Sequence, residues 1–282
     1  MIEVDLEEDQ TQLVVDAWIN NKLETQVIKL RRTIPYFEGQ LAPAVTGASV
    51  QVIDNEGTIF EFIDENNDGD YIWEPTNNLP FGKIGNDYGL LIKVDGKEYT
   101  SGTSMNRTVP VDSITWEFEE ESLGSPEGYY AEFFARDLEG LGDAYWIKAY
   151  RNGVYLNKPQ EINIAFDAGF TAGSEVDGII MIPPIREAIN RLPDSGDDPV
   201  DGADLPPWDL DDEVRVEIHS LAQASFFYLE RARIQLTLGD AAIFAEPPAN
   251  VPTNIVSSQE NETPQGFFNV AAVSELTRII TE

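Results

Sequence analysis

Apolar and polar residues alternate along much of the first hundred positions of the chain. The period of two is clear in residues 13–19, in residues 26–32 and at Ala48, Val50 and Val52. Side chains of a β-strand alternate in this way between its two faces. Turns rich in Gly, Asn and Asp separate such segments at a spacing of roughly ten residues. The pattern predicts an antiparallel sandwich, immunoglobulin-like or transthyretin-like, over residues 12–110.

A second β-rich unit is predicted for residues 111–282. Strand patterns recur at residues 111–118, 129–136 and 144–150. Helical periodicity is concentrated in residues 220–238, and Gly239 follows as a helix-terminating residue. The apolar positions of this helix are Leu221, Ala224, Phe227, Tyr228, Ala232 and Leu236. The predicted fold class is therefore mainly β, with two sandwich-like units and one packed helix in the C-terminal unit.

The charge of the chain excludes several classes of partner. Its 282 residues carry 51 acidic against 18 basic side chains, a formal net charge of −33. Such a surface repels phosphate backbones and anionic headgroups, so we expect neither nucleic-acid binding nor electrostatic attachment to a membrane. A neutral or cationic ligand, calcium or a protein partner remains compatible. The absence of cysteine excludes disulfides and thiolate chemistry, and no apolar run is long enough to span a bilayer.

A short acidic loop offers the sharpest local pattern. Asp64, Asn66, Asp68 and Asp70 place side-chain oxygens at alternate positions, and Gly69 supplies a sharp turn. This spacing matches the first half of a calcium loop, although Pro75 stands where an EF-hand has its bidentate glutamate. The predicted flanking strands exclude an EF-hand and leave a strand-loop-strand calcium site. The alternative is a polar hairpin tip with no ion. No cofactor other than this calcium is expected.

Aromatic residues in predicted loops are candidates for ligand binding. Trp208 lies in an Asp-, Gly- and Pro-rich stretch, residues 193–212, which we expect to be an exposed loop after a short helix at residues 186–192. Its ring could stack on a sugar or a partner surface, or could tie the loop back to the body. Tyr36 and Phe37, which follow Pro35, have the same two interpretations.

The polar residues do not assemble into a recognisable catalytic motif. His219 is the only histidine of the chain. Val214, Val216 and Ile218 share one face of its strand pattern, so His219 is expected on the other face, at the surface or at the helix entry. The 51 carboxylates nominate no glycosidase pair by spacing, and neither a phosphate-binding glycine loop nor a nucleophile elbow occurs. We therefore expect no enzyme and no catalytic residues.

Four segments of the chain match a known family in order. They are residues 13–19, residues 45–52, residues 145–154 with their Asn-Gly turn, and residues 247–255 followed by Gly266, Phe267 and Phe268. On these segments the chain resembles the Bacteroidetes lipoprotein family known as domain of unknown function 4249. The resemblance extends over nearly the whole chain from about Gln12.

The resemblance implies a location more than a chemistry. Members of the family look like outer-membrane lipoproteins that carry a signal peptide and a lipid-bearing cysteine, and their genes commonly neighbour TonB-dependent transporters. We therefore expect an N-terminal lipid anchor that is absent from this chain, at the cell surface. Residues 1–11 are expected to be an acidic flexible tether, or else a surface-export signal.

Three functions follow, in order of preference. The first is a non-catalytic surface lipoprotein that binds a glycan or peptide ligand or assists a TonB-dependent outer-membrane transporter. The second is a structural or adhesion module stabilised by calcium. The third is a hydrolase that acts on glycan or peptide.

Overall fold

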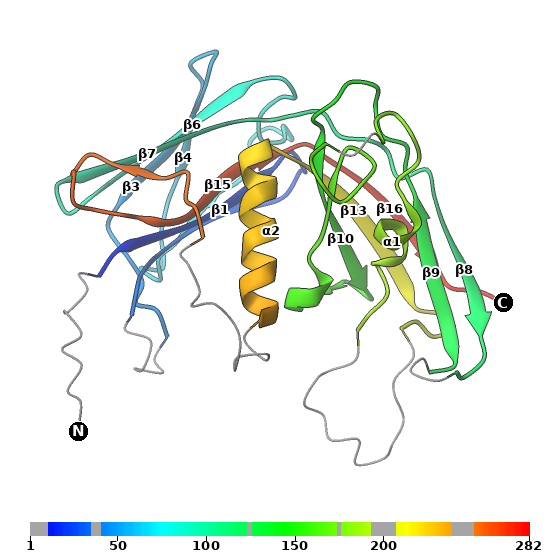
Figure 1. Ribbon diagram of the computed structural model, residues 1–282. Coiled ribbons are helices and arrows are strands. Elements are labelled where there is room, and N and C mark those ends of the chain that lie inside the picture. The colour runs from blue at the N-terminus through cyan, green and yellow to red at the C-terminus, as the bar shows by residue number, and fades with distance from the viewer. Residues whose placement is uncertain (1–10, 35–40, 123–125, 174–175, 193–206, 239–250) are drawn as a thin grey trace, which may run out of the picture. The chain divides into compact units, whose positions relative to one another are not determined.

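The computed structural model describes residues 11–34, 41–122, 126–173, 176–192, 207–238 and 251–282. The chain divides into two compact units (Figure 1). Unit 1 comprises residues 1–105 and 250–270, and unit 2 comprises residues 106–249 and 271–282. The predicted tether comprises residues 1–11, and all of it except Thr11 lies outside the described ranges. Among the described residues, no helix combines the length and apolarity needed to cross a bilayer.

Unit 1 consists of two antiparallel sheets. Its strands are β1 (Leu13–Asn20), β2 (Gln26–Arg32), β3 (Ser49–Asp54), β4 (Ile59–Phe62), β5 (Asp70–Trp73), β6 (Asp87–Val94), β7 (Lys97–Ser104), β14 (Val256–Ser257) and β15 (Gln265–Ala271). One sheet has the order β15-β1-β2-β5 and the other has the order β14-β7-β6-β3-β4. The predicted alternation is present, because every second residue of β1, β3 and β6 is buried.

Aromatic side chains fill part of the core of unit 1. Phe81 is fully buried and contacts the rings of Phe60, Trp73 and Tyr88 at centroid distances of 4.2, 5.3 and 5.7 Å. Tyr71, also buried, donates a hydrogen bond from its hydroxyl to the Val45 carbonyl. Rings that meet at tilted or edge-on angles are worth about 0.5–1.5 kcal/mol per pair beyond the area they bury. These contacts stabilise the packing of the strands and loops that carry the aromatic residues.

One segment near the C-terminus, residues 250–270, joins the first unit and not the second. The predicted division places residues 111–282 together, whereas residues 250–270 belong to unit 1, where β15 pairs with β1. The strand patterns of β15 and β16 (Val273–Ile279) are almost continuous, and only Ala272 separates them. Local periodicity carries no information about which sheet a strand joins. The return of the chain to unit 1 could therefore not be predicted from the sequence. The predicted first boundary, residue 110, lies five residues from the observed one.

Unit 2 is built around a five-stranded antiparallel sheet. Its elements are β8 (Ser113–Glu119), β9 (Gly128–Phe134), β10 (Ala144–Arg151), β11 (Val154–Tyr155), the 3-10 helix η1 (Pro159–Glu161), β12 (Asn163–Phe166), α1 (Pro183–Glu187), β13 (Glu213–Leu221), α2 (Gln223–Leu238) and β16. The sheet has the order β11-β10-β13-β16, β12 also pairs with β10, and β8 and β9 form a separate hairpin. The mainly β fold class with a packed helix is confirmed.

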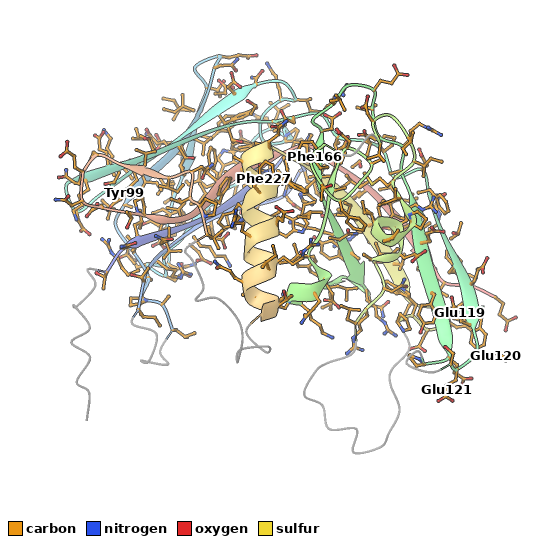
Figure 2. All side chains as sticks on the ribbon, in the orientation of Figure 1. Tyr99, Glu119, Glu120, Glu121, Phe166 and Phe227 are labelled. Atoms are coloured by element: carbon orange, nitrogen blue, oxygen red, sulfur yellow. The ribbon has the colours of Figure 1, made fainter. Side chains whose placement is uncertain are left out.

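Both helices have bounds that differ from the prediction. The long helix begins at Gln223, because Ser220 and Leu221 continue strand β13 and pair with β10. The buried face of this helix also differs from the predicted one. Phe226 and Leu229 are buried, whereas Phe227 is 42% exposed. Figure 2 labels Phe166 and Phe227 near the first turns of α2, where Phe166 contacts Phe226 at 5.3 Å. The short helix α1 begins three residues before the predicted start, because its two prolines favour the first helical turn, and it ends at Glu187, five residues before the predicted end.

Candidate functional site

Trp208, a predicted ligand-stacking residue, is fully buried in unit 2. Its indole Nε1 donates a hydrogen bond to the Asn190 side-chain oxygen at 2.9 Å, and its carbonyl accepts one from the Tyr129 backbone N–H at 3.2 Å. This burial contradicts the stacking interpretation and agrees with the alternative, a side chain that ties the loop to the body. Tyr36 and Phe37, the other predicted ligand residues, lie outside the described residues.

Arg151 fixes the end of the loop that follows Trp208. Its guanidinium contacts the carboxylates of Asp209 and Asp212 at 2.6 Å each. Burial alone would raise the pKa of Asp212, but hydrogen bonds from the Asp209 backbone, Asn152 and Arg151 hold that pKa below its ordinary value. The last part of the predicted exposed loop, residues 207–212, is therefore tied to the body of unit 2 at Trp208 and Asp212, while residues 209–211 are exposed as predicted.

In the predicted calcium loop, the three aspartate carboxylates accept hydrogen bonds from loop backbone amides or contact Arg31 of β2. Asp64 accepts hydrogen bonds from the backbone N–H groups of Asp68 and Gly69, and Asp68 accepts one from that of Asp70. The Asp70 carboxylate contacts Arg31 at 2.5 Å. Gly69 has a φ of +78°, and a Cβ there would lie 2.7 Å from the Leu30 carbonyl oxygen, so the turn requires glycine. These contacts favour the hairpin-tip alternative. A calcium ion bound through Asn66 and the three aspartates stays a prediction.

His219 lies inside the sheet of unit 2 and not at its surface. It is 5% exposed, and its Nε2 lies 2.9 Å from Glu217 Oε2. The expectation of a surface residue fails because β13 is an inner strand, flanked by β10 and β16, and both of its faces are covered over its second half. Alternation therefore identified the two faces correctly but not the exposure of the polar one.

Glu217 is the centre of a buried polar network. Only 2% exposed, it contacts Arg215 through Oε1 at 3.1 Å and accepts a hydrogen bond from the Tyr150 hydroxyl at 3.1 Å through Oε2. Burial and then the negative charge of Glu217 raise the pKa of Tyr150. The Arg215 guanidinium also stacks 3.9 Å from the centre of the Tyr150 ring. The network satisfies both carboxylate oxygens, which is the requirement for burying such a charge.

Three aspartates converge elsewhere in unit 2. Asp137 follows β9, Asp167 comes directly after β12, and Asp177 lies in the turn that precedes α1. One carboxylate oxygen from each lies within 4.8 Å of the others. Asp137 and Asp167 are 2% and 1% exposed, and Asp177 is the most exposed of the three. We refer to these residues as the aspartate cluster.

Backbone and hydroxyl groups hold the aspartate cluster in place. Asp137 accepts from the Tyr145 hydroxyl at 2.6 Å and from Gly178 N–H, Asp167 accepts from Gly142 and Asp143 N–H, and Asp177 accepts from Gly140 N–H. Burial, followed by the nearby charges of Asp143 and Asp167, raises the pKa of Asp137. Carboxylate oxygens at these separations are suitable ligands for a hard cation such as Ca²⁺.

Residue spacing does not identify the aspartate cluster. Its members are spread over 40 positions of a chain in which acidic residues are common, so spacing cannot select them. A weak signal exists in the glycines beside them, because Gly140, Gly142 and Gly178 all have positive φ and donate the N–H groups that position the carboxylates. Such amides form anion-binding turns that a side-chain pattern does not reveal.

The last segment of the family-like pattern has a structural role. The Asn254 side chain donates to the Phe268 carbonyl and accepts from the Phe268 N–H at 2.8 and 2.9 Å, as a neighbouring strand would. Thr253 donates its hydroxyl to the Gly266 carbonyl at 2.8 Å. These side chains therefore pair with strand β15 along part of its length and secure its return to unit 1.

The comparisons agree with this pattern. A family model described as "Domain of unknown function (DUF4249)" matches residues 1–277. Comparisons with curated proteins and with solved structures found no match. Because the family model covers nearly the whole chain, the protein belongs to the DUF4249 family.

Proposed function

We propose that this protein is a non-catalytic binding protein, held at the outer surface of a bacterial outer membrane by an N-terminal lipid and working beside a TonB-dependent transporter. The proposed location rests on the resemblance of the sequence to Bacteroidetes lipoproteins. The binding role is supported by the architecture, in which antiparallel sheets carry loops and a packed helix on a rigid frame.

The observation that carries the non-catalytic part is the state of His219. A general base must reach the proton of a substrate and release its own proton again. The imidazole of His219 is buried and contacts Glu217, whose second oxygen is occupied by Arg215. This environment supports a structural role for His219 in the sheet.

The native protein tests the location and the partner. Purification from detergent-solubilised outer membrane is expected to yield a lipid-modified N-terminal peptide by mass spectrometry and a TonB-dependent transporter as a stoichiometric companion. Recovery as a freely soluble monomer with an unmodified N-terminus would refute the surface-lipoprotein proposal. A non-acylated variant of the anchor residue, expressed in parallel, controls for carry-over during solubilisation.

The aspartate cluster favours a second candidate, a calcium-stabilised structural module. If calcium binds with a dissociation constant near ~10⁻⁴ M, millimolar calcium adds about 1.4 kcal/mol to the free energy of unfolding. We expect the calcium-dependent rise in Tm to disappear in Asp137→Asn and to persist in Asp68→Asn, which alters the loop predicted from sequence. The opposite result would assign calcium to that loop, and no rise in the unmutated protein would remove the metal altogether.

The raised pKa of Asp137 adds a pH dependence to that test. In the absence of calcium the folded protein holds the Asp137 proton to a higher pH than the unfolded chain does. Its contribution to stability is therefore lost as the pH rises from the unfolded value toward the raised folded value. Thermal melts across this range are expected to show a smaller decline in Asp137→Asn, and an unchanged decline would contradict the assignment.

A further inference from the structure

A shallow hollow of about 470 Å³ lies on the sheet β14-β7-β6-β3-β4 of unit 1. It is formed by β3, β6 and β7 together with the turn after β3. The residues that shape its floor and rim are Ile53, Asn55, Asp87, Gly89, Gly102 and Ser104.

Two glycines form the floor of this hollow. Gly89 of β6 and Gly102 of β7 are direct cross-strand partners, and Ile53 of β3 pairs with Gly89 on the other side. Both glycines are exposed. Glycine in the middle of a strand has no side chain to pack and loses more entropy on folding, which costs about 0.5–1 kcal/mol relative to alanine. Two such residues side by side therefore need an explanation.

Neither glycine is required by the fold. Neither has a positive φ. A Cβ at Gly89 would lie 3.9 Å from the Ile53 carbonyl oxygen, and one at Gly102 would lie 3.9 Å from the Tyr88 carbonyl oxygen, which are ordinary contacts. Gly69 of the same unit differs, because it has a positive φ and an added Cβ would clash with the Leu30 carbonyl oxygen. What the two residues provide is open space above the backbone, and glycine in a strand often marks a place where a ligand approaches closely.

The rim of the hollow presents hydrogen-bonding groups of both kinds. The exposed carboxylate of Asp87 accepts a hydrogen bond from the Ser104 hydroxyl at 2.5 Å, and Asn55 is exposed beside them. No cationic side chain lines the hollow, and the chain carries a net charge of −33, so an anionic ligand is disfavoured. The buried Asp54 carboxylate accepts the backbone N–H groups of Glu56 and Thr58 through one oxygen, Oδ1, and so holds the turn after β3.

We propose that this hollow binds one sugar ring of a neutral saccharide. The apolar face of the ring rests on the backbone of Gly89 and Gly102 beside Ile53, and ring hydroxyls pair with Asp87, Asn55 and Ser104. Hydroxyl groups both donate and accept, which matches a rim of carboxylate, amide and hydroxyl. This inference rests on the proposed binding function and adds to it a site and a class of ligand.

The decisive variant fills the floor without harming the sheet. Gly102→Val is expected to leave Tm unchanged or higher, because valine favours strands and an added Cβ makes only an ordinary contact there, and to weaken saccharide binding at least tenfold. Thr100→Val, on the same strand two residues away, is the matched control and should bind as the unmutated protein does. Asp87→Asn is expected to weaken binding with the fold intact.

The probes are neutral glucan, mannan, xylan and galactan oligosaccharides, screened on an array and measured by titration calorimetry. Binding that is lost in Gly102→Val and insensitive to salt supports the site. No binding to any probe, or equal binding by Gly102→Val, overturns it. Salt-sensitive binding of primary amines that depends on Asp87 also overturns it in favour of a cationic ligand.

The two proposals fail separately. If the native protein copurifies with a transporter but binds no saccharide, the saccharide site is wrong and the surface-lipoprotein proposal stands. If saccharide binding is lost in Gly102→Val but no lipid or transporter is found, the site is right and the proposed location is wrong.

Discussion

Gly266→Ala is expected to produce the largest loss of stability of any conservative change considered for this chain. Gly266 has a φ of +93°, and a Cβ there would lie 1.9 Å from the Val15 carbonyl oxygen and 2.7 Å from the Val15 carbonyl carbon. Backbone atoms of β1 cannot move aside without breaking its pairing with β15. We expect a loss of at least ~3 kcal/mol, or failure to fold, because strain and steric overlap act together.

Urea denaturation followed by tryptophan fluorescence measures this loss. Trp18 of β1 stacks on Phe267 of β15 at 5.9 Å and contributes to the emission together with the other four tryptophans of the chain. Gly57→Ala is the matched control, since Gly57 has a similar φ of +87° but would meet no atom within 4 Å. That control should lose only about 1 kcal/mol. Equal losses in the two variants would show that β15 does not pack on β1 as described.

Glu217→Ala is expected to be nearly as damaging, for an electrostatic reason. The substitution removes the shared partner of Arg215, His219 and Tyr150 and leaves buried polar groups uncompensated. Breaking a buried ion pair from one side typically costs about 3–5 kcal/mol. Thermal or urea unfolding should show this loss, and Glu217→Gln should show a smaller one because the amide keeps some hydrogen bonds.

An exposed glutamate supplies the comparison for Glu217. Glu119 lies at the end of β8, where Figure 2 labels it beside Glu120 and Glu121. Glu119→Ala is expected to change the free energy of unfolding by less than about 0.5 kcal/mol. If Glu217→Ala were as mild as this, the network around His219 would be neither buried nor coupled, and His219 would become a candidate catalytic residue.

The strands could be predicted because a half-buried strand shows its two faces in the sequence. Alternation in β1 and β3 corresponds to buried and exposed sides in the structure. The same signal failed at His219, because an inner strand can be covered on both faces, and at Ser220, because a strand that runs into a helix hides the boundary. Sheet membership of β15 depends on contacts with residues more than 200 positions away, which no local pattern contains.

The candidate sites were less predictable than the fold. The polar neighbours of Trp208 predict exposure, whereas the side chain is buried and the residue forms hydrogen bonds with Asn190 and Tyr129, which are distant in sequence. The aspartate cluster assembles three residues from separate loops. The hollow in unit 1 is defined by the absence of side chains at Gly89 and Gly102, and a glycine in a strand is informative only once its partner across the sheet is known.

The central claim is that this protein holds a ligand without transforming it. The most direct test incubates the protein with a bound neutral oligosaccharide and analyses the recovered saccharide by mass spectrometry. We predict that it is recovered intact, and that binding is lost in Gly102→Val. Steady release of shortened products, abolished by Asp137→Asn or Asp177→Asn while binding persists, would contradict the claim and place a hydrolytic site at the aspartate cluster.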